Sequence, residues 1–353
     1  MHTRGHAPGR IALLGSGETS LAGGRVFESL VRARGVPTPL RVAVLETPAG
    51  FELNSAQVAG RVADFLAVRL GNYRPEVTVV AARQRGTRFT PDDPAITAPL
   101  LAADLLFMGP GSPTYAVRQL QDSLAWHRLI ARQRVGATLS FVSAAVIAIG
   151  AWALPVYEIY KAGHDLHWQP GLDLFGAYGL KLVFVPHWNN TEGGAELDTS
   201  RCFMGQARFE VLRSMLPPDV TVVGIDEHTA LAVDLADGAA AVMGAGDVTV
   251  LNGLGARTFS QEGRFSLTEF GPFAWPEPDA GLPPGVWAEA LAALEADEAE
   301  QPAPDEVLAL SAERQAARER RDWAAADRLR HDIEALGWRV QDTSEGPQCI
   351  PIA

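Results

Sequence analysis

The chain has 353 residues, of which 47% are hydrophobic, and its formal net charge is −12. No apolar run approaches the roughly 20 residues that cross a bilayer, and two cysteines, Cys202 and Cys349, cannot build a disulfide framework. The negative charge argues against general nucleic-acid binding, which depends on neutralising phosphates. The polar N-terminus precedes only a short apolar stretch, so we expect no signal peptide and a cytoplasmic protein.

The first half of the chain alternates short apolar runs with segments of helical periodicity. Runs without polar alternation are typical of strands buried on both faces of a parallel sheet, and alternation with helices at this spacing indicates a doubly wound α/β fold. Helices are expected over 57–70 and 115–134. Strands are expected over 9–15, 41–46, 76–82, 104–108 and 137–142.

From Leu180 onward the apolar runs become closely spaced and predict further strands. Those over 230–233, 239–243 and 248–251 are expected to form a meander at the sheet edge, after strands over 182–185 and 220–225. The sequence predicts three domains or segments. They are an α/β domain over 1–275, an acidic Pro- and Ala-rich linker over 276–306, and a helical hairpin over 307–353.

Candidate catalytic residues follow the ends of predicted strands, where sites form in open α/β sheets. Ser143 follows an apolar run and begins a small-residue helix, as a nucleophile at a strand-to-helix elbow does. A serine needs a base and an orienting acid, and His187 and Glu158 are the candidates. The backbone N–H groups of Gly111 and Ala144 are the expected oxyanion donors.

Ser143, Glu158 and His187, in that order, resemble the cyanophycinase and dipeptidase E group of serine hydrolases. Residues 224–231 read Gly-Ile-Asp-Glu-His-Thr-Ala-Leu and are similar to that group's Gly-Ile-Asp-Glu-x-Thr-Ala-Leu segment. The resemblance covers residues 10–270. It implies a class I glutamine amidotransferase-like fold, a Ser-His-Glu triad, and a small peptide or amide substrate. We expect no cofactor. The sequence departs from the group's elbow, Gly-x-Ser-Ala-Gly, because Phe141 and Ala145 replace both glycines.

A polar stretch follows His187 and predicts a substrate-binding loop made by Asn189, Asn190, Asp198 and Arg201, with Arg201 available for a carboxylate. The alternative is a solvated loop. His164, Asp165 and His167 raise the alternative of a metal site, but the chain has no His-Glu-x-x-His or Cys-x-x-Cys motif. We therefore predict no metal.

Residues 314–346 resemble the C-terminal tail of cysteinyl-tRNA synthetases, and hairpins of the UVR type look similar. The resemblance implies contact with tRNA or a protein partner. The catalytic signatures of a synthetase are absent, and six arginines face five acids between Ser311 and Asp332, which does not favour strong RNA binding by charge. A hairpin used for docking or for forming a homodimer is the alternative.

Two hypotheses follow from these patterns. The first is a serine hydrolase that cleaves a peptide, isopeptide or amide bond through Ser143, His187 and Glu158. The second is a non-catalytic amidotransferase-like binding module, linked to tRNA or a protein partner through its C-terminal hairpin. Phe141 favours the second hypothesis, and the set of serine, glutamate and histidine favours the first.

Overall fold

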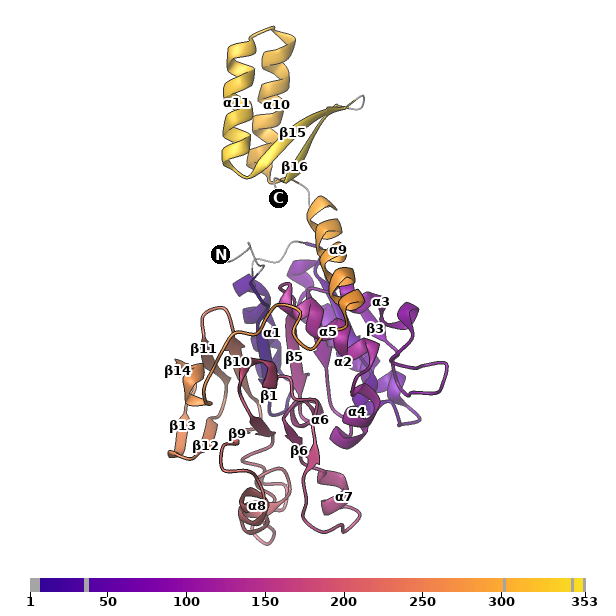
Figure 1. Ribbon diagram of the computed structural model, residues 1–353, viewed down its shortest axis with the longest axis vertical. Helices are drawn as coiled ribbons and strands as arrows, with labels where there is room; N and C mark the ends of the chain where they lie inside the picture. The colour runs from indigo at the N-terminus through magenta and orange to yellow at the C-terminus, as the bar shows by residue number, and fades with distance from the viewer. Residues whose placement is uncertain (1–6, 35–37, 301–302, 344–345, 352–353) are drawn as a thin grey trace. The chain divides into compact units, whose positions relative to one another are not determined.

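The computed structural model describes residues 7–34, 38–300, 303–343 and 346–351 (Figure 1). The chain divides into two compact units, which we call the first unit (Met1–Ala290) and the second unit (Leu291–Ala353). The N-terminal residues 1–6 and residues 301–302 of the expected linker lie outside the described residues. No helix in the described ranges is long and apolar enough to cross a membrane.

An eight-stranded sheet forms the centre of the first unit, in the order β14-β11-β10-β1-β5-β4-β2-β3. Five of its strands are parallel, as the apolar runs predict: β1 (Ile11–Leu14), β5 (Thr138–Val142), β4 (Leu105–Met108), β2 (Arg41–Leu45) and β3 (Glu76–Val80). β1, β4 and β5 are buried along their whole length. The mixed α/β class with a large, mostly parallel sheet is therefore confirmed.

Helices cover both faces of this sheet. Apolar side chains of α1 (Leu21–Arg34) and α2 (Ser55–Arg69) pack on one face. Those of α3 (Pro94–Ala102), α4 (Pro113–Leu120) and α5 (Leu124–Arg134) pack on the other. The helix expected over 115–134 is two helices, because the chain turns at Asp122 (φ 55°) and the Ser123 hydroxyl caps α5 by accepting from the N–H of Trp126.

The strands between residues 180 and 270 divide between two sheets. β10 (Thr229–Asp234), β11 (Ala239–Gly244) and β14 (Arg264–Ser266) extend the large sheet beyond β1 in antiparallel pairs (Figure 1). A second sheet has the order β13-β12-β9-β8. It contains β8 (Leu182–Val185), β9 (Thr221–Ile225), β12 (Val248–Asn252) and β13 (Gly255–Phe259).

The expected three-stranded meander is wrong. β10 and β11 pair as expected, but β12 leaves them and pairs with β9 and β13 in the second sheet. The apolar side chains of β12, among them Val248 and Val250, join the same core as those of β9.

Short elements complete the first unit. The helix α6 (Ala144–Ala148) follows β5, and α7 (Val156–Tyr160) follows the short strand β6 (Trp152–Ala153). The helix α8 (Gly205–Ser214) precedes β9. The others are β7 (Gln169–Pro170) and the 3₁₀ turns η1 (Thr47–Ala49), η2 (Gly71–Tyr73), η3 (Gly176–Tyr178) and η4 (Leu267–Glu269).

The first half of the expected linker is folded with the first unit. The guanidinium of Arg134 donates to the carbonyls of Pro278 and Ala280, and Arg128 pairs with Glu289 at 2.9 Å. The helix α9 (Pro284–Glu300) begins there, and its Ala290 is fully buried. The residues of the expected linker up to Ala290 therefore fold with the first unit, and its acidic residues Glu289, Glu295 and Asp297 lie on α9.

The second unit contains α10 (Asp305–Glu319), α11 (Trp323–Ala335), β15 (Trp338–Thr343) and β16 (Gly346–Pro351). The two helices pack together, and β15 pairs antiparallel with β16. Its small core contains Ala303, Val307 and Ile333. Arg314 holds the strands to α10 through a two-pronged ion pair with Asp342, at 2.9 and 3.2 Å.

Candidate active site

Ser143 lies at a sharp turn between β5 and α6. Its backbone has φ 52° and ψ −111°, a conformation that costs a non-glycine residue energy and that clusters at functional sites. The backbone N–H of Ser143 donates to the carbonyl of Leu14 on the neighbouring strand β1 (3.1 Å), so the turn is anchored on the sheet. This is the strand-to-helix elbow that the sequence predicts.

The elbow forms without its usual glycines because both replacements point into the core. Phe141 is 1% exposed and Ala145 is fully buried, and both belong to the core cluster on the α3–α5 face of the sheet. Phe141 lies between Leu13 and Met108 on the two adjacent strands. Its ring therefore fills core space, and it does not separate Ser143 from the base.

His187 follows β8 and Pro186, and it too has a left-handed backbone, with φ 51°. Its Nε2 lies 2.9 Å from Ser143 Oγ, within hydrogen-bond distance, although 44 residues separate the two in sequence. The carbonyl of His187 accepts from the N–H groups of Asn190 and Cys202, which fix the backbone at this point. The structure thus brings together the expected nucleophile and the expected base.

The carboxylate that contacts the base is Glu227, at the end of β9. Its Oε1 lies 2.9 Å from His187 Nδ1 and also accepts from Asn190 Nδ2 at 2.9 Å. The N–H of Glu227 donates to Asn189 Oδ1 at 2.8 Å. With a proton on Nδ1 donated to Glu227, Nε2 is free to accept the Ser143 hydroxyl proton, which is the arrangement that a serine nucleophile needs.

The environment of Glu227 favours its charged form. Partial burial raises the pKa of the Glu227 carboxyl, but hydrogen bonds from His187 and Asn190 outweigh burial, so that its pKa lies below the ordinary 4.5. A carboxylate that stays ionised beside an imidazole stabilises the imidazolium that forms when the base takes a proton.

Glu158 does not contact His187, and the expectation that it orients the base is wrong. Its Oε1 accepts from Thr114 Oγ1 at 2.5 Å, so it faces the first turn of α4. Glu227 takes the place expected for it, and it lies within the Gly224–Leu231 segment whose similarity to the hydrolase group is the signal in the sequence that points to it. Parallel pairing of β8 with β9 explains the difference, since it brings the residues after these strands together.

The two expected oxyanion donors follow the neighbouring parallel strands β5 and β4. Ala144 is the first residue of α6, where backbone N–H groups have no partner within the helix. Gly111 has φ 146° and packs on η1, where a Cβ atom would lie 2.1 Å from the carbonyl oxygen of Pro48. The N–H of Ser112 donates to that same carbonyl at 2.9 Å, so glycine is required for the close approach of the two loops.

Three of the four expected substrate-binding residues form hydrogen bonds within the protein. Asn189 and Asn190 bind Glu227, as described above. Asp198 accepts from the N–H groups of Ser200 and Gln206 and so organises its own loop. A hydrogen bond from the Ser200 side chain, together with those from the two N–H groups, holds the pKa of the exposed Asp198 carboxyl below its usual range.

Arg201 differs from these three residues. Its guanidinium carbon lies 3.8 Å from the ring centroid of Trp188, and one N–H donates to the Trp188 carbonyl at 2.8 Å. Partial burial lowers the pKa of Arg201 from its ordinary value.

The segment after Arg201 adds an apolar wall beside the base. Arg201, Cys202 and Phe203 all have left-handed backbones, with φ of 56°, 58° and 66°. The Phe203 ring lies 6.0 Å from the His187 ring and 5.3 Å from that of Tyr160 on α7. Complete burial raises the pKa of the Cys202 thiol to about 12, and the charge of Glu227 contributes. Three consecutive strained residues at a candidate site are typical of functional geometry.

His164 and His167, which raise the alternative of a metal site, do not lie in a cluster of possible metal ligands within the described ranges. The rings of His164 and His167 stack with centroids 6.3 Å apart, and His167 Nδ1 bonds the Asp165 carbonyl. Among the residues that the structure describes, no three histidine, cysteine or acidic side chains come together as a metal would require.

Comparison with known structures supports the fold. No family model matches the chain. A peptidase structure from an acI-B1 Actinobacterium superposes with a TM-score of 0.59 at 21% identity, covering 75% of this chain and 100% of that one. A candidate peptidase E protein from Listeria monocytogenes EGD-e gives a TM-score of 0.42 at 15% identity, covering 64% of this chain and 95% of that one.

Comparison with curated proteins concerns a short segment alone. A cysteine–tRNA ligase from Burkholderia lata is 50% identical over 50 residues, and one from Rubrobacter xylanophilus is 51% identical over 45. These segments are 14% and 13% of this chain, and the chain spans about a tenth of the length of those ligases. The chain therefore has the fold of a peptidase structure and a segment similar to cysteine–tRNA ligases.

Proposed function

We propose that the first unit is a serine hydrolase that cleaves a peptide, isopeptide or amide bond. The observation that carries the proposal is the 2.9 Å contact between Ser143 Oγ and His187 Nε2 at a strained elbow. A serine hydroxyl is a weak nucleophile until a base accepts its proton. The likeness of the fold to a peptidase structure adds support, and it does not favour the alternative of a non-catalytic binding module.

The proposed reaction runs in two halves. Ser143 Oγ attacks the substrate carbonyl while its proton passes to His187 Nε2, and Glu227 holds the imidazole through Nδ1. The N–H groups of Gly111 and Ala144 stabilise the oxyanion. The tetrahedral intermediate then expels the amine, which takes the proton from His187, and leaves an acyl group on Ser143. Water, activated by His187, releases the acid and restores the serine.

Arg201 is the proposed substrate-binding residue of the adjoining loop. Its side chain is fixed by stacking on Trp188, and a planar guanidinium binds a carboxylate through two parallel hydrogen bonds. Asn189 and Asn190, which the sequence places in the same role, are proposed instead to support Glu227.

Hydrolysis of defined substrates tests this proposal. The full chain is incubated with a pool of dipeptides, β-aspartyl isopeptides and simple amides, and products are identified by mass spectrometry. Products that form with the wild type and not with Ser143→Ala support the proposal. Equal product formation by Ser143→Ala would show that Ser143 does not carry the reaction.

A second proposal concerns the second unit, for which the similarity to cysteine–tRNA ligases favours contact with a tRNA. Arg320 and Arg321 are exposed where α10 meets α11, and Trp323 beside them is 59% exposed. Exposed aromatic rings stack on unpaired bases and arginines bind phosphates.

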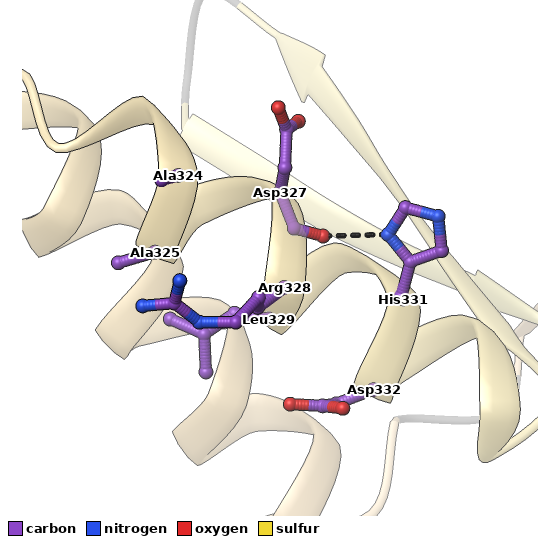
Figure 2. A pocket seen from close by; sticks show the side chains of 7 residues that line it. All are labelled: Ala324, Ala325, Asp327, Arg328, Leu329, His331 and Asp332. Atoms are coloured by element: carbon purple, nitrogen blue, oxygen red, sulfur yellow. Dashed lines mark hydrogen bonds between the residues drawn. The ribbon is translucent and has the colours of Figure 1, made fainter.

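The adjoining surface of α11 has a hollow that carries both signs of charge (Figure 2). It is lined by Arg328 and His331 together with Asp327 and Asp332, and His331 bonds the Asp327 carbonyl at 2.7 Å. Charge alone therefore does not favour RNA here, and the proposal depends on the arginines and the tryptophan at the helix junction.

Retention of total tRNA by the immobilised full chain tests the second proposal. Replacing Arg320 and Arg321 with alanine is expected to reduce retention, as is deletion of residues 307–353. Unchanged retention in both variants would remove the tRNA contact and leave a protein partner or a second copy of the chain as the occupant of this surface.

A further inference from the structure

Glu158 does not contact the base His187, but its carboxylate is held in a specific environment that calls for another explanation. One of its carboxylate oxygens, Oε1, accepts a 2.5 Å hydrogen bond from Thr114 Oγ1. The other, Oε2, is buried and has no hydrogen-bond partner among the described residues. A charged group held this way is costly unless the interaction that it makes is needed.

The hydrogen bonds beyond Thr114 lead to the proposed oxyanion loop. Thr114 Oγ1 lies 3.0 Å from Ser112 Oγ, and Ser112 Oγ accepts from the N–H of Tyr115 at 3.2 Å. Since Thr114 donates its single proton to Glu158, it must accept the proton of Ser112. The chain of donors therefore runs from the N–H of Tyr115 through Ser112 and Thr114 to the carboxylate, with one consistent direction.

A negative charge at the end of such a chain strengthens each link. Hydrogen bonds to ionised groups are shorter and about twice as strong as neutral ones, and linked hydroxyls polarise one another. Ser112 is thereby held through its side chain by Thr114 and Glu158 of α7, while its own N–H donates to the carbonyl of Pro48 in η1. These contacts restrain Gly111, the residue before Ser112.

We propose that Glu158 is a positioning residue for the loop that carries Gly111, acting through Thr114 and Ser112, in the hydrolase proposed above. A donor displaced by about 1 Å can lower a rate by two orders of magnitude. The α7 helix also carries Tyr160, which contacts Phe203 beside His187. The segment therefore contacts both the oxyanion loop and the wall next to the base.

The experiment measures the rate constant for covalent labelling of Ser143 by a fluorophosphonate, in the full chain, as a function of pH. Glu158→Ala and Thr114→Val are each expected to slow labelling about 10- to 100-fold. The double variant is expected to be no slower than the slower single variant, because both changes break one chain of hydrogen bonds. Glu158→Gln is expected to recover part of the rate, since its amide oxygen still accepts from Thr114 but lacks the charge that strengthens the chain.

Two readouts separate positioning from a structural role. The acid-side midpoint of the pH–rate profile is expected to stay unchanged in Glu158→Ala, because Glu158 does not contact the imidazole, and to move in Glu227→Gln. A recovered labelling rate in Glu158→Gln would show that the slow labelling of Glu158→Ala is not caused by a general loss of folding. Thermal unfolding of each variant measures folding directly. Glu210→Ala, an exposed residue of α8, is the control and should label as the wild type does.

The outcomes distinguish this inference from the proposed function on which it rests. Wild-type labelling at Ser143 with an equal rate in Glu158→Ala would overturn the inference alone. The inference would also be overturned if the effects of Glu158→Ala and Thr114→Val were additive in the double variant. A shift of the pH–rate profile in Glu158→Ala like that in Glu227→Gln would overturn it as well. A wild-type chain that fails to label at all would overturn the proposed function, and the inference with it.

Discussion

His187 and Glu227 are joined by a 2.9 Å hydrogen bond from Nδ1 to Oε1, although 40 residues separate them in sequence. They lie at the ends of β8 and β9, two parallel neighbours in the second sheet. Ser143 comes from the end of β5 in the large sheet. The candidate site is therefore assembled where the carboxyl ends of strands from two sheets meet, and each of its three residues owes its place to strand pairing.

Glu227→Gln is expected to lower kcat/KM, or the rate of labelling at Ser143, by about two to four orders of magnitude. Glutamine keeps the size of the side chain but loses the charge that stabilises the imidazolium. Glu196→Gln, an exposed residue in the loop after His187, is the matched control and should leave the rate unchanged. A Glu227→Gln variant as fast as this control would mean that another group orients the base.

The hydrogen bond between His187 and Glu227 predicts that the free energy of unfolding depends on pH in the acidic range. The pKa of Glu227 is lower in the folded chain than its ordinary 4.5. Its contribution to stability is therefore fully present above that value and is lost as the pH falls through the lower folded pKa. The free energy of unfolding of the wild type minus that of Glu227→Gln, from urea titrations, should be constant at neutral pH and shrink below 4.5. A difference that grows on acidification would contradict the assigned hydrogen bonds.

Gly111→Ala is expected to destroy the proposed oxyanion loop. A Cβ would lie 2.1 Å from the Pro48 carbonyl, at a φ of 146° that disfavours side chains, and loss of one oxyanion donor lowers rates by about 10²–10³. Gly60→Ala in α2 is the control, since its Cβ would meet nothing within 4 Å. That change should stabilise the fold by about 0.4–1 kcal/mol. Labelling that is equally fast in both variants would exclude Gly111 from the reaction.

The two cysteines should differ in reactivity. Complete burial raises the pKa of Cys202 to about 12, so about one molecule in 10⁴ carries the thiolate at pH 8. Cys349 is half-buried in the hairpin of the second unit. Iodoacetamide followed by peptide mapping should modify Cys349 first in the native chain and both cysteines in urea. Rapid native modification of Cys202 would show that the segment behind His187 opens.

Much of the fold follows from the sequence. The five parallel strands were predictable because runs such as Ile11–Leu14 and Leu105–Met108 are buried on both faces. The pairing of the later strands was not, because an apolar run such as Val248–Asn252 indicates a strand without indicating its sheet.

The candidate site also follows from the sequence only in part. Ser143 and His187 are predictable because each follows the end of an apolar strand, Ser143 directly and His187 after Pro186. Glu158 was preferred as the acid because it lies between them in the chain, whereas the choice of Glu227 depends on the pairing of β8 with β9. Phe141 favours the second hypothesis in the sequence because its sequence neighbours do not reveal that its side chain packs into the core on one face of the sheet.

The most direct test of the central claim is the intact mass of the full chain after treatment with a fluorophosphonate. We predict a single covalent adduct, mapped by proteolysis to Ser143, which is absent in Ser143→Ala and strongly slowed in His187→Ala. A wild-type chain that keeps its original mass, or an adduct that persists in Ser143→Ala, would contradict the assignment of Ser143 as a nucleophile activated by His187.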